Sequence, residues 1–243
     1  MTAVELATVA AAVFVAGFVQ MLSGFGFALL AMPLMTLQVP TKEAVVISTL
    51  LGGSVTLYQA WHGRHHVERH IARHLVIGAY LGMPFGLWVF LAVDDHVLRG
   101  ILGAAVLVAA VLLAARVRLS HVGTGLEVGA GVVSGVLNTS LSTNGPPLVF
   151  ALQARHLGPD AFRGTINVVF ACCNVLGLSL FLLAGKVTAD GVIAALVALP
   201  ALTAGQLIAY PLRRHVAGDR FRTLVLGLLV VTAATSIVSA FRA

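Results

Sequence analysis

The sequence predicts an all-α polytopic membrane protein with two inverted repeats, each a broken or re-entrant helical element followed by three transmembrane helices. Of its 243 residues, 59% are hydrophobic and 10% are charged, whereas about a quarter of an ordinary soluble domain is charged. So few charges cannot cover a water-facing surface. Apolar runs of about 20 residues recur along the chain, and two longer apolar stretches match each other. These observations exclude a soluble enzyme, a nucleic-acid-binding protein and a disordered adaptor.

Six runs have the length and hydropathy of single transmembrane helices, and each is bounded by charge or by a turn. They span residues 42–61, 71–92, 97–115, 161–185, 189–211 and 220–241. Two further stretches, 3–37 and 123–153, are too long for one ordinary crossing, and polar and glycine residues interrupt both near the middle. Because glycine and proline break regular helix, we predict one break at residues 23–26 and another at 138–145.

The two interrupted stretches match at an offset of 114 residues. The matching positions pair Ala16, Gly17, Val19, Pro33 and Leu34 with Ala130, Gly131, Val133, Pro147 and Leu148. Each stretch is followed by a proline and then by three ordinary spans. We therefore predict that residues 1–118 form a first transmembrane repeat and residues 119–243 a second, together one integral membrane domain, which is a common plan of secondary transporters.

The distribution of lysine and arginine indicates the path of the two long stretches. If each stretch crosses once, seven of these residues lie on the N-terminal side and eight on the other, without the expected cytoplasmic excess. If each enters and returns, four lie on the N-terminal side, namely Lys42, Arg99, Lys186 and Arg242, and eleven lie opposite. The second path gives the expected excess, inverts the two halves and places both termini outside the cytoplasm.

The two breaks are the candidate substrate site, because irregular backbone at membrane depth is tolerated only inside protein or beside a water-filled cavity. Half-helices beginning near Gly26 and Gly145 would direct N-terminal amides towards the midplane, which suits an anion. The candidate binding residues combine these breaks with neutral hydrogen-bonding side chains: Gln20, Ser23, Gly24, Gly26, Asn138, Thr139, Ser142, Thr143, Asn144, Gly145, Arg163 and Asn167. The alternative is that these small and polar residues serve helix packing.

Charge within the spans points to a negative substrate. Arg163, Asn167 and Asn174 recur at helical spacing, so one polar stripe could face the centre. The guanidinium of Arg163 either reaches the membrane interface or holds two oxygens of an anion. No Asp or Glu lies near the middle of any predicted span, although a proton pump or cation antiporter normally needs a buried carboxylate.

Five histidines crowd a thirteen-residue stretch: His62, His65, His66, His70 and His74. The last three would share one helical face, and that spacing can bind zinc. Three arginines interleave with them and oppose the capture of a cation, so we favour a basic cytoplasmic loop and expect no metal site. A metal-cation exporter that uses the His62–His74 loop is the alternative.

An intramembrane enzyme is not expected. A rhomboid-type serine protease needs a Gly-x-Ser-Gly turn and a histidine at depth, whereas Gly131-Val-Val-Ser134-Gly135 is one residue out of register. All nine histidines lie in loops or at span edges, so no general base is available to a serine. The adjacent Cys172 and Cys173 fit small apolar residues, and no cofactor is expected.

Several runs resemble the sulfite exporter TauE/SafE family. Residues 17–33, GFVQMLSGFGFALLAMP, are similar to its first signature, and residues 129–135 through Asn144-Gly-Pro-Pro147 resemble its second. The run Phe162-Arg-Gly-Thr165 is similar to the basic helix start that follows. The resemblance covers the whole chain and implies a multi-pass permease of a bacterial-type inner membrane that moves sulfite, sulfonates or related organosulfur anions, often outward.

The second repeat departs from the family's pattern, because residues 138–144 read NTSLSTN where a glycine-rich turn is common. This departure suggests a more polar pocket and a carboxylate or larger oxyanion as an alternative substrate. We expect alternating access at a midplane site between the two repeats. The expected partners are a small anion and the lipid bilayer, with no nucleic acid. A permease for small carboxylates or neutral solutes, a proton or sodium coupling ion and a homo-oligomer stay open.

Overall fold

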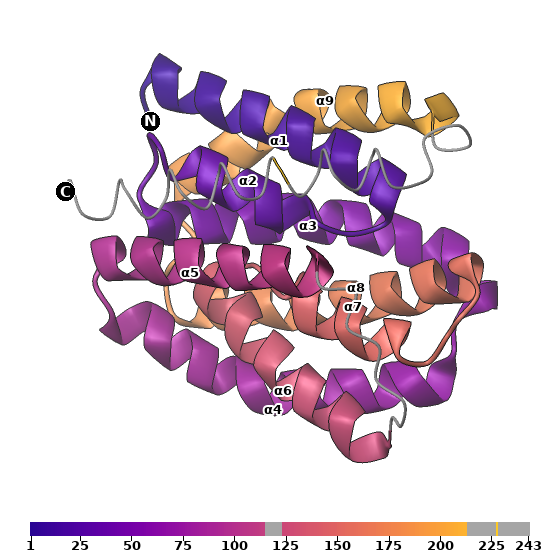
Figure 1. Ribbon diagram of the computed structural model, residues 1–243. Helices are drawn as coiled ribbons and strands as arrows, with labels where there is room; N and C mark the ends of the chain where they lie inside the picture. The colour runs from indigo at the N-terminus through magenta and orange to yellow at the C-terminus, as the bar shows by residue number, and fades with distance from the viewer. Residues whose placement is uncertain (115–122, 213–226, 228–243) are drawn as a thin grey trace. The chain divides into compact units, whose positions relative to one another are not determined.

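The computed structural model describes residues 1–114, 123–212 and 227, and every regular element in them is helical (Figure 1). In chain order the elements are α1 (Ala3–Ser23), α2 (Phe27–Met35), α3 (Thr41–Gly63), η1 (Arg64–His66), α4 (Arg69–Ala92), α5 (Asp95–Ala114), α6 (Thr124–Leu141), α7 (Gly145–Gln153), α8 (Pro159–Leu183) and α9 (Ala189–Leu212). Five predicted spans are confirmed as α3, α4, α5, α8 and α9. The predicted span 220–241 lies outside the described residues.

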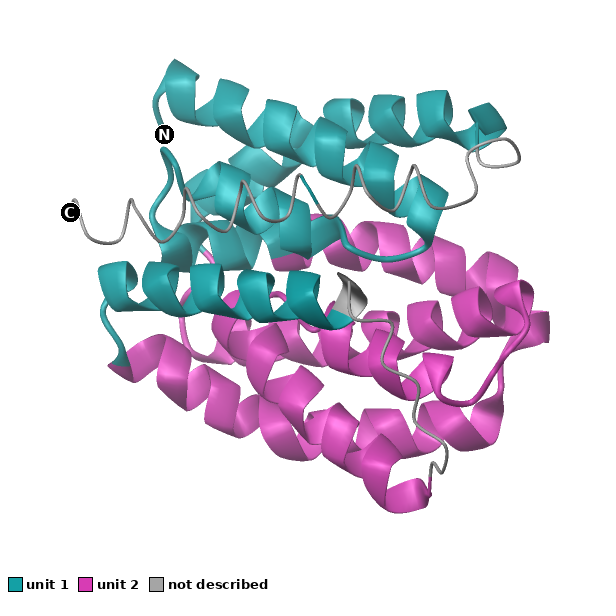
Figure 2. Ribbon diagram, viewed as in Figure 1, with its two compact units in different colours: residues 1–48, 93–116, 188–243 teal, residues 49–92, 117–187 magenta. Residues whose placement is uncertain are grey.

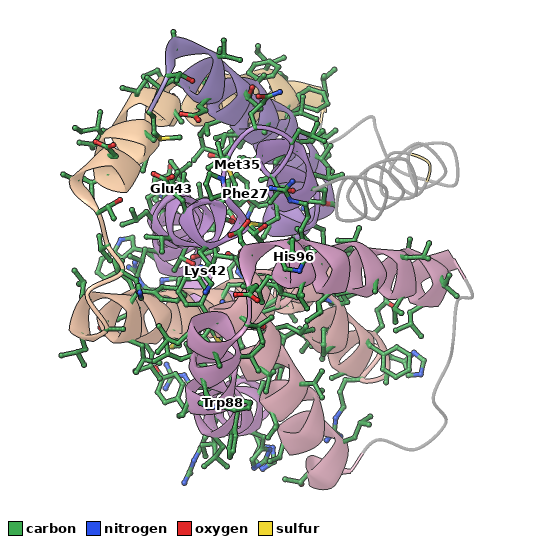
Figure 3. All side chains as sticks on the ribbon, turned by 90° about the vertical axis from the view of Figure 1, so that its left-hand side faces the viewer. Phe27, Met35, Lys42, Glu43, Trp88 and His96 are labelled. Carbon is green, nitrogen blue, oxygen red and sulfur yellow. The ribbon has the colours of Figure 1, made fainter. Side chains whose placement is uncertain are left out.

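Six of the described helices are long and apolar enough to cross a membrane: α1, α3 with η1, α4, α5, α8 and α9. Large apolar side chains on these helices are exposed, including Phe85 and Trp88 on α4 and Leu207 on α9, each about two-thirds or more exposed. Trp88 is labelled in Figure 3. Exposed apolar surface on this scale is costly in water and favourable against lipid tails. The chain is a multi-pass helical membrane protein.

The first long stretch breaks where the sequence predicts. Helix α1 ends at Ser23 and α2 begins at Phe27. Gly24 and Gly26 between them have φ of 85° and 95°, in the left-handed region that a side chain disfavours. Glycine at these two positions therefore lets the chain turn sharply between two helices.

The second stretch breaks in the same way between α6 and α7. Ser142 closes α6 with a left-handed φ of 57°, and α7 begins at Gly145. Helices α2 and α7 have nine residues each, about half the length that a hydrocarbon core requires. Both predicted breaks are confirmed, and at each of them a longer helix is followed by a short one.

The chain forms two compact units (Figure 2). Unit 1 comprises residues 1–48, 93–116 and 188–243, and unit 2 comprises residues 49–92 and 117–187. Each unit takes segments from both predicted repeats, 1–118 and 119–243. The repeat boundaries themselves stay a prediction.

In unit 1, several helices begin at the same end. The carboxylate of Asp95, at the start of α5, accepts hydrogen bonds of 2.8 Å from the backbone N–H groups of Thr41 and Lys42 at the start of α3. The Met1 ammonium lies 3.3 Å from the carboxylate of Asp190, which begins α9. Figure 3 looks towards this end, where Lys42 and His96 are labelled.

Replacing Asp95 with alanine should lower the free energy of unfolding by about 1–2 kcal/mol, because it removes the acceptor for two N–H groups at a helix start. The adjacent His96 is exposed, so His96→Ala should change stability by less than about 0.5 kcal/mol. Thermal unfolding of the two variants in detergent tests the difference. Equal midpoints would show that Asp95 does not stabilise the start of α3.

In unit 2, α4 packs closely against α6 through small residues. A Cβ at Gly78 would lie 3.0 Å from the Cα of Gly131, and a Cβ at Gly82 would lie 2.9 Å from the carbonyl carbon of Val132. The Thr139 hydroxyl on α6 donates to the backbone oxygen of Met83 on α4 at 2.7 Å. Close backbone approach through glycine is how membrane helices gain packing energy without a hydrophobic effect between them.

Candidate functional site

The four candidate residues in unit 1 divide into three that shape the backbone and one with an unpartnered atom. Gly24 and Gly26 provide the left-handed turn. The Ser23 hydroxyl lies 2.8 Å from the oxygen of Val19 and 2.6 Å from that of Phe25. Gln20 is 2% exposed, and its Oε1 has no hydrogen-bond partner. The local geometry thus accounts for Ser23 and both glycines and leaves Gln20 available for a ligand.

In unit 2, two of the candidate residues hold the fold together. Thr139 donates to Met83 across the α4–α6 contact. Ser142 is the left-handed cap of α6, where its N–H donates to the oxygen of Asn138 at 2.9 Å and its hydroxyl lies 3.5 Å from that of Thr49. These bonds supply partners for backbone carbonyl groups at the C-terminal end of α6 that lack one within the helix.

Four other candidates in unit 2 carry buried polar atoms that have no partner or only a weak one. Both Nδ2 and Oδ1 of Asn138 are unpartnered, although the residue is 1% exposed. The Thr143 hydroxyl and Asn167 Oδ1 are also unpartnered, Asn144 Nδ2 has only the weak acceptor of the buried Cys173 thiol beside it, and all three residues are buried. An unmet buried polar group costs about 1–3 kcal/mol, so a concentration of such groups indicates a place where a polar ligand or water binds.

Neighbouring residues place the side chain of Asn138 against α8. A Cβ at Gly177 would lie 2.9 Å from Asn138 Oδ1 and 3.3 Å from the methyl carbon of Met83. Gly177 therefore provides the room that the Asn138 amide occupies. Further towards the start of α8, the Asn174 amide donates to the Thr56 hydroxyl at 3.2 Å, so Asn174 is used in packing.

The backbone of the second break is fixed from α6. The Ser134 hydroxyl donates to the backbone oxygen of Asn144 at 3.0 Å. Gly145 begins α7 and is followed by Pro146 and Pro147, which have no N–H. The two prolines therefore remove two of the expected N-terminal amides of α7, and side-chain donors must supply most hydrogen bonds to an anion there.

Arg163 and Asn167 lie on α8, in its second and third turns. Asn167 is 6% exposed and Arg163 is half-buried. The arginine is therefore neither fully solvated nor enclosed. Both belong to unit 2, together with the second break.

The structure reveals a buried charged network that the sequence does not predict. Glu127, in the first turn of α6, has a side chain that is 0% exposed. Its Oε2 lies 2.7 Å from Nδ1 of His74 on α4, and its Oε1 accepts a hydrogen bond of 2.7 Å from Nε of Arg155. The Nη2 of Arg155 also contacts Oε1.

Glu127 is close to a helix end, as the sequence indicates, but it is completely buried, so the inference that the chain lacks a buried carboxylate is wrong for this residue. The pair also gives the path of the second broken element, because Arg155 follows α7 and meets the start of α6. The chain thus enters through α6 and returns through α7. The sequence contained a signal for this ion pair, because residues of opposite charge stand at the two ends of a stretch that is predicted to enter the membrane and return.

The histidine stretch does not form one continuous helical face. His66 lies in η1, and α4 begins only at Arg69. His70 and His74 share α4, with ring centroids 4.3 Å apart. Among the described residues, the potential metal-binding group is His70, His74 and Glu127, whose ligand atoms lie within 4.8 Å of one another.

Comparison with known proteins identifies one family. The sequence model of the sulfite exporter TauE/SafE family matches residues 9–236, nearly the whole chain. No curated protein and no solved structure matches the chain. The family is one of membrane transporters, which agrees with the apolar helices and with the paired broken elements.

Proposed function

Because the chain belongs to the sulfite exporter TauE/SafE family, we propose that it is a secondary transporter for small anions of the sulfite, sulfonate or organosulfur class. The proposed location is a bacterial-type inner membrane, with both termini outside the cytoplasm. The observation that carries the substrate charge is the set of buried donors at the second break that have no partner or only a weak one, on Asn138, Thr143 and Asn144. Neutral donors bind an anion with a smaller desolvation cost than buried cations incur.

The proposed anion site in unit 2 comprises Asn138, Thr143 and Asn144, and the other two candidates, Asn167 and Arg163, lie further towards the start of α8, ten and fourteen residues before the Gly177 that Asn138 contacts. The amides and the hydroxyl supply donors that α7 cannot supply, because its second and third residues are prolines. Arg163 lies about 21 Å before Gly177 along α8, so its planar guanidinium, which suits two oxygens of one anion, would bind an anion at a separate position from Asn138. The acceptor atom of Asn138 would bind the protonated part of a substrate or water.

Each unit carries one broken helical element: α1 breaks into α2 in unit 1, and α6 breaks into α7 in unit 2. Paired broken helices in inverted repeats are typical of carriers that work by alternating access, the mechanism we propose. The inverted relation of the two repeats is part of this proposal.

Thermal stabilisation of the detergent-purified protein tests the substrate class. Sulfite, sulfoacetate, taurine, thiosulfate, sulfate and oxalate are compared with chloride. A ligand present at 100 times its dissociation constant should stabilise the fold by about 2.7 kcal/mol. Stabilisation by a sulfur oxyanion or sulfonate alone supports the proposal, and uptake of that anion into proteoliposomes then tests transport. Stabilisation by no anion, together with no anion uptake, would contradict it.

Replacing Asn138 with alanine should abolish most of the anion's stabilising effect and weaken its binding at least tenfold, about 1.4 kcal/mol. The free energy of unfolding of the unliganded protein should change by less than about 1 kcal/mol, because the side-chain amide that is removed has no hydrogen-bond partner. Asn174→Ala is the matched control, since it removes the bond to Thr56. It should lower stability by about 1 kcal/mol and retain the anion effect. The reverse pattern would assign Asn138 to packing.

A further inference from the structure

Two histidines and a carboxylate on two different helices converge at one end of unit 2. His70 and His74 occupy successive turns at the start of α4, and Glu127 lies in the first turn of α6. One ligand atom from each residue lies within 4.8 Å of the other two. Two imidazoles and one carboxylate form a donor set that zinc prefers, and three protein ligands leave a fourth position open for water.

We propose that His70, His74 and Glu127 form a zinc-binding site that links the start of α4 to the start of α6. His70 is exposed and His74 is half-buried, so an ion can reach the site from solvent. The buried carboxylate provides the negative charge that zinc requires. This site is independent of the proposed anion site, because none of its ligands belongs to that set.

The geometry requires a small adjustment on binding. Nδ1 of His74 and Oε2 of Glu127 are 2.7 Å apart, whereas two ligand atoms of a tetrahedral zinc are separated by about 3.3 Å. The zinc would therefore replace the hydrogen bond between them with two metal bonds. Arg155 holds the other oxygen, Oε1, and so orients the carboxylate as an outer-shell group does in many zinc sites.

Nearby positive charge limits the affinity. Arg155 contacts the same carboxylate, and the exposed Arg69 and Arg73 flank the two histidines on α4. These charges oppose a divalent cation, so binding should be weaker than at a structural site with four ligands.

Titration of the tag-free, detergent-purified full chain with zinc chloride tests the proposal by calorimetry. The wild type should bind one saturable equivalent, and His70→Gln and His74→Gln should each weaken binding at least tenfold. Cobalt(II) in place of zinc should give visible absorption bands of a low-symmetry nitrogen and oxygen site, which the same variants lose. The double variant His65→Gln/His66→Gln is the control and should bind zinc as the wild type does.

Absence of saturable zinc binding to the wild type would overturn the proposal. Unchanged affinity in His70→Gln would also overturn it, and this variant is decisive because His70 is exposed and its replacement should not disturb folding. Loss of binding in the control with retention in His74→Gln would assign zinc to the loop before α4. None of these outcomes depends on whether the protein transports an anion.

Discussion

Replacing Arg155 with alanine is expected to lower the free energy of unfolding by about 3–5 kcal/mol. The Glu127 side chain is 0% exposed, and Arg155 donates to its Oε1. Without the guanidinium, the buried carboxylate would keep only the contact with His74. A loss of this size should lower the thermal unfolding midpoint by roughly 10 °C. Size-exclusion chromatography of heated detergent samples measures this midpoint.

Arg73→Ala is the matched control for this prediction. Arg73 precedes His74 on α4 and is exposed, so its loss removes the same charge without exposing a buried partner and should change stability by less than about 1 kcal/mol. Equal destabilisation by both variants would show that net charge, and not the buried pair, controls stability.

The double variant Glu127→Gln/Arg155→Ala separates the pair's net contribution from the cost of leaving one partner alone. A neutral amide at position 127 no longer needs a cation, so the double variant should be more stable than Arg155→Ala alone. A double variant that loses the sum of both single effects would mean that the two residues act independently. Because Arg155 joins the end of α7 to the start of α6, the same loss should loosen the α6–α7 element that carries Asn138 and Asn144.

Much of the helical layout follows from local sequence. Runs of about 20 apolar residues predict α3, α4, α5, α8 and α9 because each such run matches the thickness of a bilayer. The breaks are equally local. Gly24 and Gly26 adopt a backbone conformation that other residues disfavour, and the two prolines after Gly145 begin a helix without adding N–H groups that need acceptors.

The roles of individual polar residues could not be predicted, because they depend on partners far along the chain. Thr139 and Thr143 have the same chemistry, yet Thr139 donates to a carbonyl 56 positions away, whereas the Thr143 hydroxyl is buried without a partner. Helical spacing likewise failed for His66, which lies in the short turn before α4. The burial of Glu127 required the return of α7, which brings Arg155 next to it.

Replacing Gly135 with alanine is expected to destabilise the protein by about 3 kcal/mol, at the upper end of the usual cost of overpacking. A Cβ at Gly135 would press on the backbone oxygen of Ala79 and lie 2.8 Å from its carbonyl carbon. Backbone atoms cannot rotate away as a side chain can, so α4 and α6 must separate. The thermal midpoint in detergent should fall, and the separation should also displace Asn138, one turn further along α6.

Gly129→Ala on the same helix is the control, because a Cβ there has no heavy atom within 4 Å and the residue is exposed. Alanine also favours a helix over glycine, so this variant should be as stable as the wild type or gain up to about 1 kcal/mol. If both variants are equally stable, the close approach of α4 and α6 does not limit the fold. Gly135→Ala could also fold but lose its stabilisation by the anion, while Gly129→Ala keeps it. The glycine contact would then position the proposed site as well as pack the helices, because a purely structural role would lower stability without removing the anion's effect.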